Sequence, residues 1–212
     1  MEPYIRNDQY NFIKDQTKTL VNGHSSVNDK AVLNALKSLA LEKVLNLFTD
    51  LSPEQKEMLS PIAEITDKDQ AEQFLATLKP HVIPFKELTP QGIKKLIPKA
   101  KKLKPPAMEK MDLQELSYLG WDDKGSQKKY IIANYGEKLI GLQGTFKPLG
   151  KKSICAFCNK TEEVGMFMTE TKGAVQGTFT KRGNYICADS QKCNQNLTSL
   201  NKLDGFIRRI FE

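Results

Sequence analysis

The chain has 212 residues, of which 39% are hydrophobic and 27% charged, so it can form one large domain or two modest ones with packed cores. It has 32 lysines and arginines against 25 aspartates and glutamates, a formal net charge of +7. No apolar run approaches the roughly 20 residues that a membrane-spanning helix needs, and the polar N-terminus lacks the apolar segment of a secretory signal. This composition excludes a membrane protein and predicts a cytoplasmic one.

The first 80 residues have the apolar spacing of amphipathic helices separated by short polar breaks. Asn, Asp, Ser and Thr favour helix N-termini, and Pro favours the first helical position. Four helix starts of this kind occur, at Asn7-Asp8, Asn28-Asp29, Ser52-Pro53 and Thr66-Asp67. Four helices with short connections predict an antiparallel bundle over residues 1–82, with the Leu and Phe side chains as its core.

A lysine-rich segment punctuated by prolines follows the predicted bundle. Residues 81–110 contain eight lysines against Glu87 and Glu109, and a short helix is predicted from Thr89-Pro90 to Pro98. Two interpretations stay open: a solvated lysine face on a connecting element, or an electrostatic site for an acidic protein or RNA.

From about residue 112 the apolar residues follow the alternation of β-strands. Turn signals occur at Asp122–Gly125 and at Gly136–Lys138, the second of them typical of a hairpin. The predicted strands are Leu116–Trp121, Lys129–Tyr135 and Leu139–Phe146. Gly141 and Gly144 in the last of these indicate a bulge or a close approach of another backbone.

All four cysteines lie in the last third of the chain, as the pair Cys155 and Cys158 and the pair Cys187 and Cys193. Four thiolates suit a closed tetrahedral zinc site. The C-x2-C pair is typical of a metal-binding knuckle, and the second pair joins a strand end to a helix that Asp189 or Ser190 can cap. The spacing therefore predicts a treble-clef finger with one structural zinc. Two disulfides are the alternative, but they require an oxidising compartment.

No feature of the sequence indicates catalysis. A zinc closed by four thiolates has no open position for Lewis-acid chemistry. His24, expected in a loop, and His81 lie far apart, and the chain lacks a phosphate-binding glycine loop and a nucleophile elbow. We predict that the protein is not an enzyme and has no small-molecule substrate.

The residues around the zinc site include basic and aromatic side chains suited to a protein interface. Thr178–Tyr185 is interpreted as a hairpin that turns at Gly183, with Lys181 and Arg182 at its basic tip. Aromatic residues such as Tyr185 and Phe206 are equally compatible with the core and with an interface. A terminal helix is predicted to carry one apolar face, formed by Leu197, Leu200, Leu203, Phe206, Ile207 and Ile210.

These patterns together predict an α+β protein of two domains. An N-terminal antiparallel helical bundle occupies residues 1–82. A C-terminal α/β domain occupies residues 83–212 and ends in the four-cysteine treble-clef zinc finger, at about 150–212.

The segments GWDDKGSQKKYIIANY, CAFCNK and GTFTKRGNYICADSQKCNQNL resemble the FusB/FusC-type fusidic acid resistance proteins. These are elongation factor G-binding proteins, and some relatives carry a fibronectin-binding protein label. The resemblance is strong over residues 112–211. It is weaker in the helical half, where YNFIKDQ and VNDKAV are similar.

The resemblance implies a helical bundle followed by a treble-clef domain that binds elongation factor G. It implies that the protein helps the factor to leave drug-stalled ribosomes, meeting the ribosome in passing and modifying neither drug, factor nor RNA. The family's contact residues correspond to Arg182, Tyr185 and Phe206. Ile154 stands where the family tends to have an aromatic residue, so one contact is expected to be weaker. The zinc ligands correspond to Cys155, Cys158, Cys187 and Cys193.

Two other functions are considered beside this one. A zinc-finger protein that binds RNA or the ribosome would use the finger and the lysine-rich segment, with an affinity that falls steeply with salt. An adhesin for fibronectin conflicts with the missing signal segment and with a reduced thiolate site.

Overall fold

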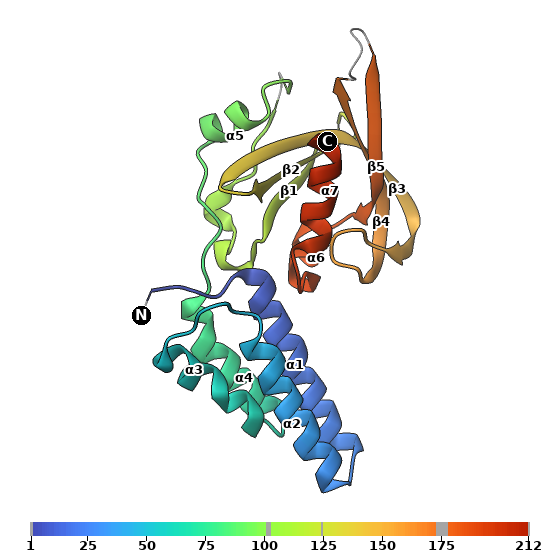
Figure 1. Cartoon of the computed structure of the whole chain (residues 1–212). Helices are drawn as coiled ribbons and strands as arrows, with labels where there is room; N and C mark the ends of the chain where they lie inside the picture. Colours follow the sequence, from blue (N-terminus) through green and yellow to red (C-terminus); the bar gives the residue numbers. More distant parts are fainter. Residues whose placement is uncertain (1, 101–102, 124, 173–177, 212) are drawn as a thin grey trace. The chain divides into compact units, whose positions relative to one another are not determined.

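The computed structural model describes residues 2–100, 103–123, 125–172 and 178–211. The chain forms two compact units, Met1–Ile83 and Pro84–Glu212 (Figure 1). The first is helical and the second contains one antiparallel sheet with short helices, which confirms the α+β class. Lys101 and Lys102 of the lysine-rich segment, and Lys124 of the first predicted turn, lie outside the described residues. None of the helices in the described part of the chain has the length and apolar character that a membrane span requires.

The first unit is a bundle of four α-helices with two 3₁₀ turns. The turns are η1 (Ser60–Glu64) and η2 (Lys79–His81). The core contains side chains that are almost fully buried, including Ile13, Leu20, Val44, Leu59, Ile62 and Leu78. The helices are α1 (Asn7–Ser26), α2 (Lys30–Leu45), α3 (Pro53–Leu59) and α4 (Lys68–Leu78).

Side-chain caps explain where three of these helices begin. The Asp29, Ser52 and Asp67 side chains each accept hydrogen bonds from backbone N–H groups of the first helical turn. Pro61 cannot donate an N–H, and the chain tightens from α3 into η1 just before it. The prediction that His24 lies in a loop is wrong, because it lies in the last turn of α1.

The second unit contains one five-stranded antiparallel sheet in the order β1-β2-β3-β4-β5. The strands are β1 (Tyr118–Asp123), β2 (Lys128–Tyr135), β3 (Lys138–Ile154), β4 (Thr161–Lys172) and β5 (Phe179–Cys187). The α-helices are α5 (Pro90–Leu96), α6 (Ser190–Asn196) and α7 (Asn201–Phe211). Two 3₁₀ turns, η3 (Met108–Lys110) and η4 (Leu113–Glu115), precede the sheet.

Both faces of this sheet are buried, and β2 shows why its sequence is almost continuously apolar. Successive side chains of a strand point to opposite faces. Tyr130 and Ile132 pack with α5 residues and the segment before β1. Ile131 and Ala133 pack with the cysteines and the apolar side of α7. The zinc finger therefore shares its core with the sheet.

The longest strand, β3, extends eight residues beyond the predicted end at Phe146. Its first half pairs with β2 up to Thr145, and its second half pairs with β4 from Thr145 onwards. The register shifts between Pro148 and Lys152, where Gly150 has a φ of 70°. An irregularity of this kind allows a proline inside a strand, and this is why the sequence pattern ended too early.

Two predictions near the C-terminus are wrong. β5 continues through Gly183, so the chain does not turn there, and Lys181 and Arg182 lie within the strand. Gly183 is instead required by packing, because a Cβ atom there would overlap the Phe167 carbonyl oxygen. The predicted single apolar helix is also interrupted: α6 ends before Leu197, and α7 starts after Leu200.

Candidate metal centre and partner surface

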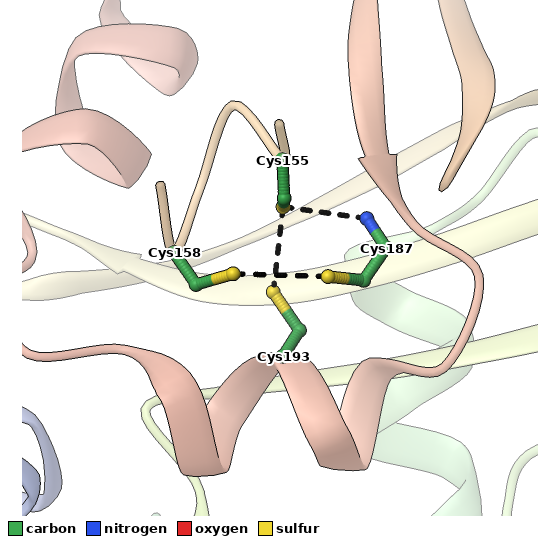
Figure 2. A group of neighbouring side chains, drawn as sticks. All are labelled: Cys155, Cys158, Cys187 and Cys193. Carbon is green, nitrogen blue, oxygen red and sulfur yellow. Dashed lines mark hydrogen bonds between the residues drawn. The ribbon is translucent and has the colours of Figure 1, made fainter. Parts of the chain in front are cut away.

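The four cysteine side chains converge on one buried point (Figure 2). All four Sγ atoms lie within 4.8 Å of one another. Cys155 Sγ lies 3.8 Å from Cys193 Sγ, and Cys158 Sγ lies 3.7 Å from Cys187 Sγ. A tetrahedron with Zn–S bonds of roughly 2.3 Å has S–S edges of about 3.8 Å. The donor set therefore fits one zinc ion with closed coordination, and all four thiols are free of disulfides.

Backbone N–H groups favour a negative charge on the Cys155 sulfur. The N–H groups of Phe157 and Cys187 each lie 3.3 Å from Cys155 Sγ, to which they donate. The knuckle closes through Asn159, which has a φ of 57° and whose N–H donates to the Cys155 carbonyl at 3.0 Å. Asn tolerates this left-handed conformation better than most residues. Hydrogen bonds to a thiolate favour its ionised form.

The protonation of the cysteines shows why the site needs a cation. Hydrogen bonds with Cys158, Cys187 and Cys193 lower the pKa of the Cys155 thiol. Hydrogen bonds with Cys155 and its neighbours raise the pKa of the Cys193 thiol. One thiolate is thus stabilised at the expense of the others, because adjacent like charges cannot all form unaided. A divalent zinc supplies the charge that allows all four to ionise.

Two side chains that the sequence did not single out attach the finger to the sheet. The first is Asn194, which lies on α6 directly after Cys193 and is 1% exposed. Its Oδ1 accepts from the N–H groups of Ser117 at 2.7 Å and Tyr118 at 3.1 Å. Its Nδ2 donates to the carbonyls of Tyr118 at 2.9 Å and Ser190 at 3.0 Å. The ligand-bearing helix is therefore hydrogen-bonded to the start of β1.

The second is Lys129, a fully buried lysine on β2. Its Nζ lies 2.9 Å from an Asp122 carboxylate oxygen and donates to the Ala188 carbonyl at 2.8 Å. It also lies 4.6 Å from the centre of the Phe146 ring, a cation–π distance. Ala188 follows the ligand Cys187, so this lysine holds the end of β5 against the sheet.

Ionisable groups around α6 are shifted in a consistent way. A hydrogen bond from Lys192, at 2.8 Å, lowers the pKa of Glu162, and the same bond raises the pKa of Lys192. Burial raises the pKa of Tyr118 well above its usual range, and the nearby Cys193 raises it further. The Tyr118 hydroxyl therefore stays protonated beside the thiolates at neutral pH.

The predicted partner-binding residues of β5 lie on both faces of this edge strand, and Phe206 lies in the core. Lys181 and Tyr185 alternate along β5 with Arg182, so the first two point to one face of the strand and Arg182 to the other. Tyr185 is 37% exposed, and its carbonyl accepts a hydrogen bond from the Ala156 N–H, two residues after the exposed Ile154.

Phe206 lies in the core of the second unit, with only 3% of its surface exposed. Its ring centre lies 5.1 Å from that of Phe157 and 6.1 Å from that of Phe167. Phe157 lies between two zinc ligands in the knuckle. Phe206 therefore packs inside the finger. A direct contact between Phe206 and a partner stays a prediction.

Comparisons with known proteins identify relatives of both units. Residues 4–86 match a family model described as the N-terminal part of elongation factor G-binding protein. Residues 97–209 match one described as the FBP C-terminal treble-clef zinc-finger. The structure of the fusidic acid resistance protein FusC is similar, with a TM-score of 0.83 and 31% sequence identity over 97% of each chain. No curated protein sequence matches the chain. The treble-clef match and the buried cysteine cluster confirm the prediction of one structural zinc.

Proposed function

The chain belongs to the FusB/FusC family of elongation factor G-binding proteins, and from this premise we propose that it binds elongation factor G and promotes its release from ribosomes stalled by fusidic acid. The observation that carries the proposal is the similarity to FusC over 97% of both chains. A partner of this kind acts on the ribosome, so we propose a cytoplasmic protein that meets the ribosome in passing.

We propose that β5 and the adjoining end of β3 present the contact surface. Tyr185 and Ile154 offer exposed apolar area, since Ile154 is 62% exposed. Arg182 and Lys181 supply the charged rim that protein interfaces commonly carry. The excess of basic residues in the chain favours rapid encounter with an acidic surface.

The proposed mechanism is binding rather than chemistry. A protein shifts the conformational equilibrium of its partner only by its differential affinity for the partner's states. We propose that the chain binds the released form of elongation factor G more tightly than the ribosome-bound form. The zinc supplies no reaction; it holds β5 and α6 in a fixed geometry, so that little ordering entropy is lost on binding.

The binding step is tested by isothermal titration of purified elongation factor G with the zinc-loaded chain. Tyr185→Ala and Arg182→Ala are each expected to raise Kd about tenfold or more, as interface anchors do. Leu39→Ala is the control, because Leu39 is 44% exposed on α2 of the first unit, and it should leave Kd within about twofold. Undetectable binding of the wild type would overturn the proposal.

The release step is tested separately with ribosomes that hold labelled elongation factor G and fusidic acid. The dissociation rate of the labelled factor should rise with the concentration of the wild-type chain, and Tyr185→Ala should need about tenfold higher concentrations for the same rise. A chain that binds the free factor but leaves this rate unchanged would contradict release while preserving binding.

A further inference from the structure

The second unit contains a groove of about 450 Å³ that none of the four zinc ligands lines. Its floor is the β3 segment 141–145. Its walls are residues 96–99 at the end of α5, residues 168–170 of β4, and Ile210 and Phe211 of α7. Figure 1 shows α5 and the β4–β5 pair on opposite sides of β3. Gly141 and Gly144 contribute only backbone to the floor, since a Cβ atom at either would lie 2.5 Å from a neighbouring carbonyl oxygen.

The sheet divides at this groove. β3 pairs with β4 only from Thr145 and Met168 onwards. Before Thr145 it pairs with β2 alone, and beyond Met168 β4 pairs with β5 alone. Within the described parts of these strands, the facing edges therefore lack a strand partner. Open strand edges offer backbone donors and acceptors to an extended peptide.

The side chains that line the groove define which peptide would fit. Apolar atoms come from Leu96, Ile97, Pro98, Met168 and Phe211. The charged lining residues are Lys99, Lys128 and Lys181 against Glu170, which gives an excess of two positive charges. Glu170 pairs with Lys181 at 3.8 Å.

A buried acceptor in the floor also lacks a partner. Gln143 Oε1 is buried and accepts no hydrogen bond among the residues that the structure describes. The atom has almost no accessible surface, so a bound peptide N–H can donate to it only after the Gln143 side chain rotates.

We propose that this groove binds an extended acidic segment of elongation factor G, which adds a strand between β3 and β4 where these two strands separate. This inference rests on the proposed function for the identity of the partner. A single-stranded nucleic acid fits less well, because stacking platforms need several aromatic rings and Phe211 is the sole aromatic lining residue in the described chain.

The charge of the groove is tested by the double variant Lys99→Glu with Lys128→Glu in the full chain. Its Kd for purified elongation factor G should rise about tenfold or more, and the salt dependence of binding should weaken. The matched control is Lys94→Glu with Lys110→Glu, two exposed lysines of the second unit outside the groove. It changes net charge equally and should alter Kd by less than about threefold. Equal losses in both variants would overturn the assignment to the groove.

Hydrogen exchange in the wild-type complex tests strand addition without any substitution. The amides within Leu139–Gly144 of β3 and Thr169–Lys172 of β4 that point away from β2 and β5 should exchange at least about tenfold more slowly when elongation factor G is bound, as paired strand amides do. Unchanged exchange there, with protection elsewhere in the second unit, would overturn the groove and leave the proposed function intact. A wild type that does not bind elongation factor G would refute the proposed function itself. If the chain binds RNA in a way that depends on Lys99 and Lys128 and does not bind the factor, the groove is a site for RNA and not for a peptide.

Discussion

Asn194 gives the start of β1 the hydrogen bonds that a neighbouring strand would otherwise provide. It satisfies two N–H groups and one carbonyl of residues that lie about 76 positions earlier in the chain. Its own helix also carries the ligand Cys193. One side chain thus couples the position of a zinc ligand to the edge of the sheet.

Asn194→Ala should destabilise the second unit by about 2–4 kcal/mol, because it leaves the part-buried N–H of Ser117 and the buried N–H of Tyr118 without their acceptor. The measurement is urea unfolding of the zinc-loaded protein, followed by tryptophan fluorescence. Asn196→Ala is the matched control on the same helix. The Asn196 side chain donates one hydrogen bond, to Glu162 at 3.0 Å, and its loss should cost about 1 kcal/mol or less. Equal losses would show that Asn194 does not attach the helix to the sheet.

The cysteines and these polar residues differ in how far the sequence reveals them. The spacing of the four cysteines predicts a metal site by itself, because few other arrangements use it. These cysteines are Cys155, Cys158, Cys187 and Cys193. The roles of Asn194 and Lys129 depend on partners brought close only by the fold. The burial of Phe206 was equally open, because helical spacing marks an apolar face without saying what covers it.

Glycines decide how closely the strands and helices of the second unit approach one another. A Cβ atom at Gly144 would lie 2.5 Å from the Met168 carbonyl oxygen and 2.6 Å from the Phe167 ring. A Cβ atom at Gly141 would lie 2.5 Å from the Leu96 carbonyl oxygen. The predicted close approach at these two glycines is therefore confirmed. Gly205, in the middle of α7, has no heavy atom within 4 Å of such a Cβ position.

Alanine substitutions at two of these glycines should have opposite effects. Gly144→Ala forces a methyl group against backbone and should destabilise the second unit by about 1–3 kcal/mol. Gly205→Ala should stabilise it by about 0.5–1 kcal/mol, since glycine loses more backbone entropy than alanine in a helix interior. Thermal unfolding of the two zinc-loaded variants beside the wild type measures both. A lower melting temperature for Gly205→Ala would contradict the open position of this residue in α7.

Most elements followed from periodicity and caps, but β4 was not predicted, and element ends did not follow. The helix starts at Asp29, Ser52 and Asp67 were predictable because a side-chain oxygen caps each one. The continuation of β3 past Pro148 depends on a register shift, and the break between α6 and α7 separates residues that still share one core. Neither is encoded in local periodicity.

The two compact units have separate hydrophobic cores, one centred on the helices and the others on the two faces of the sheet. The zinc ligands belong to the second unit, where Cys155, Cys187 and Cys193 are at most 2% exposed. Since a four-thiolate site does not exist in the unfolded chain, metal affinity contributes directly to folding. We therefore propose that the second unit depends on zinc and that the first unit folds without it.

Chelation of zinc, or Cys187→Ser, should unfold the second unit while the helical unit stays folded. Two signals separate the units. Trp121, the single tryptophan, stacks on Tyr130 at 5.1 Å in the sheet, so its emission should shift to that of an exposed indole. The longest helices, α1 and α2, lie in the first unit, so most of the helical circular dichroism should persist and then melt in its own transition. Loss of both signals in one step would refute independent folding, and retention of the native tryptophan signal after complete zinc removal would show that packing alone sustains the finger.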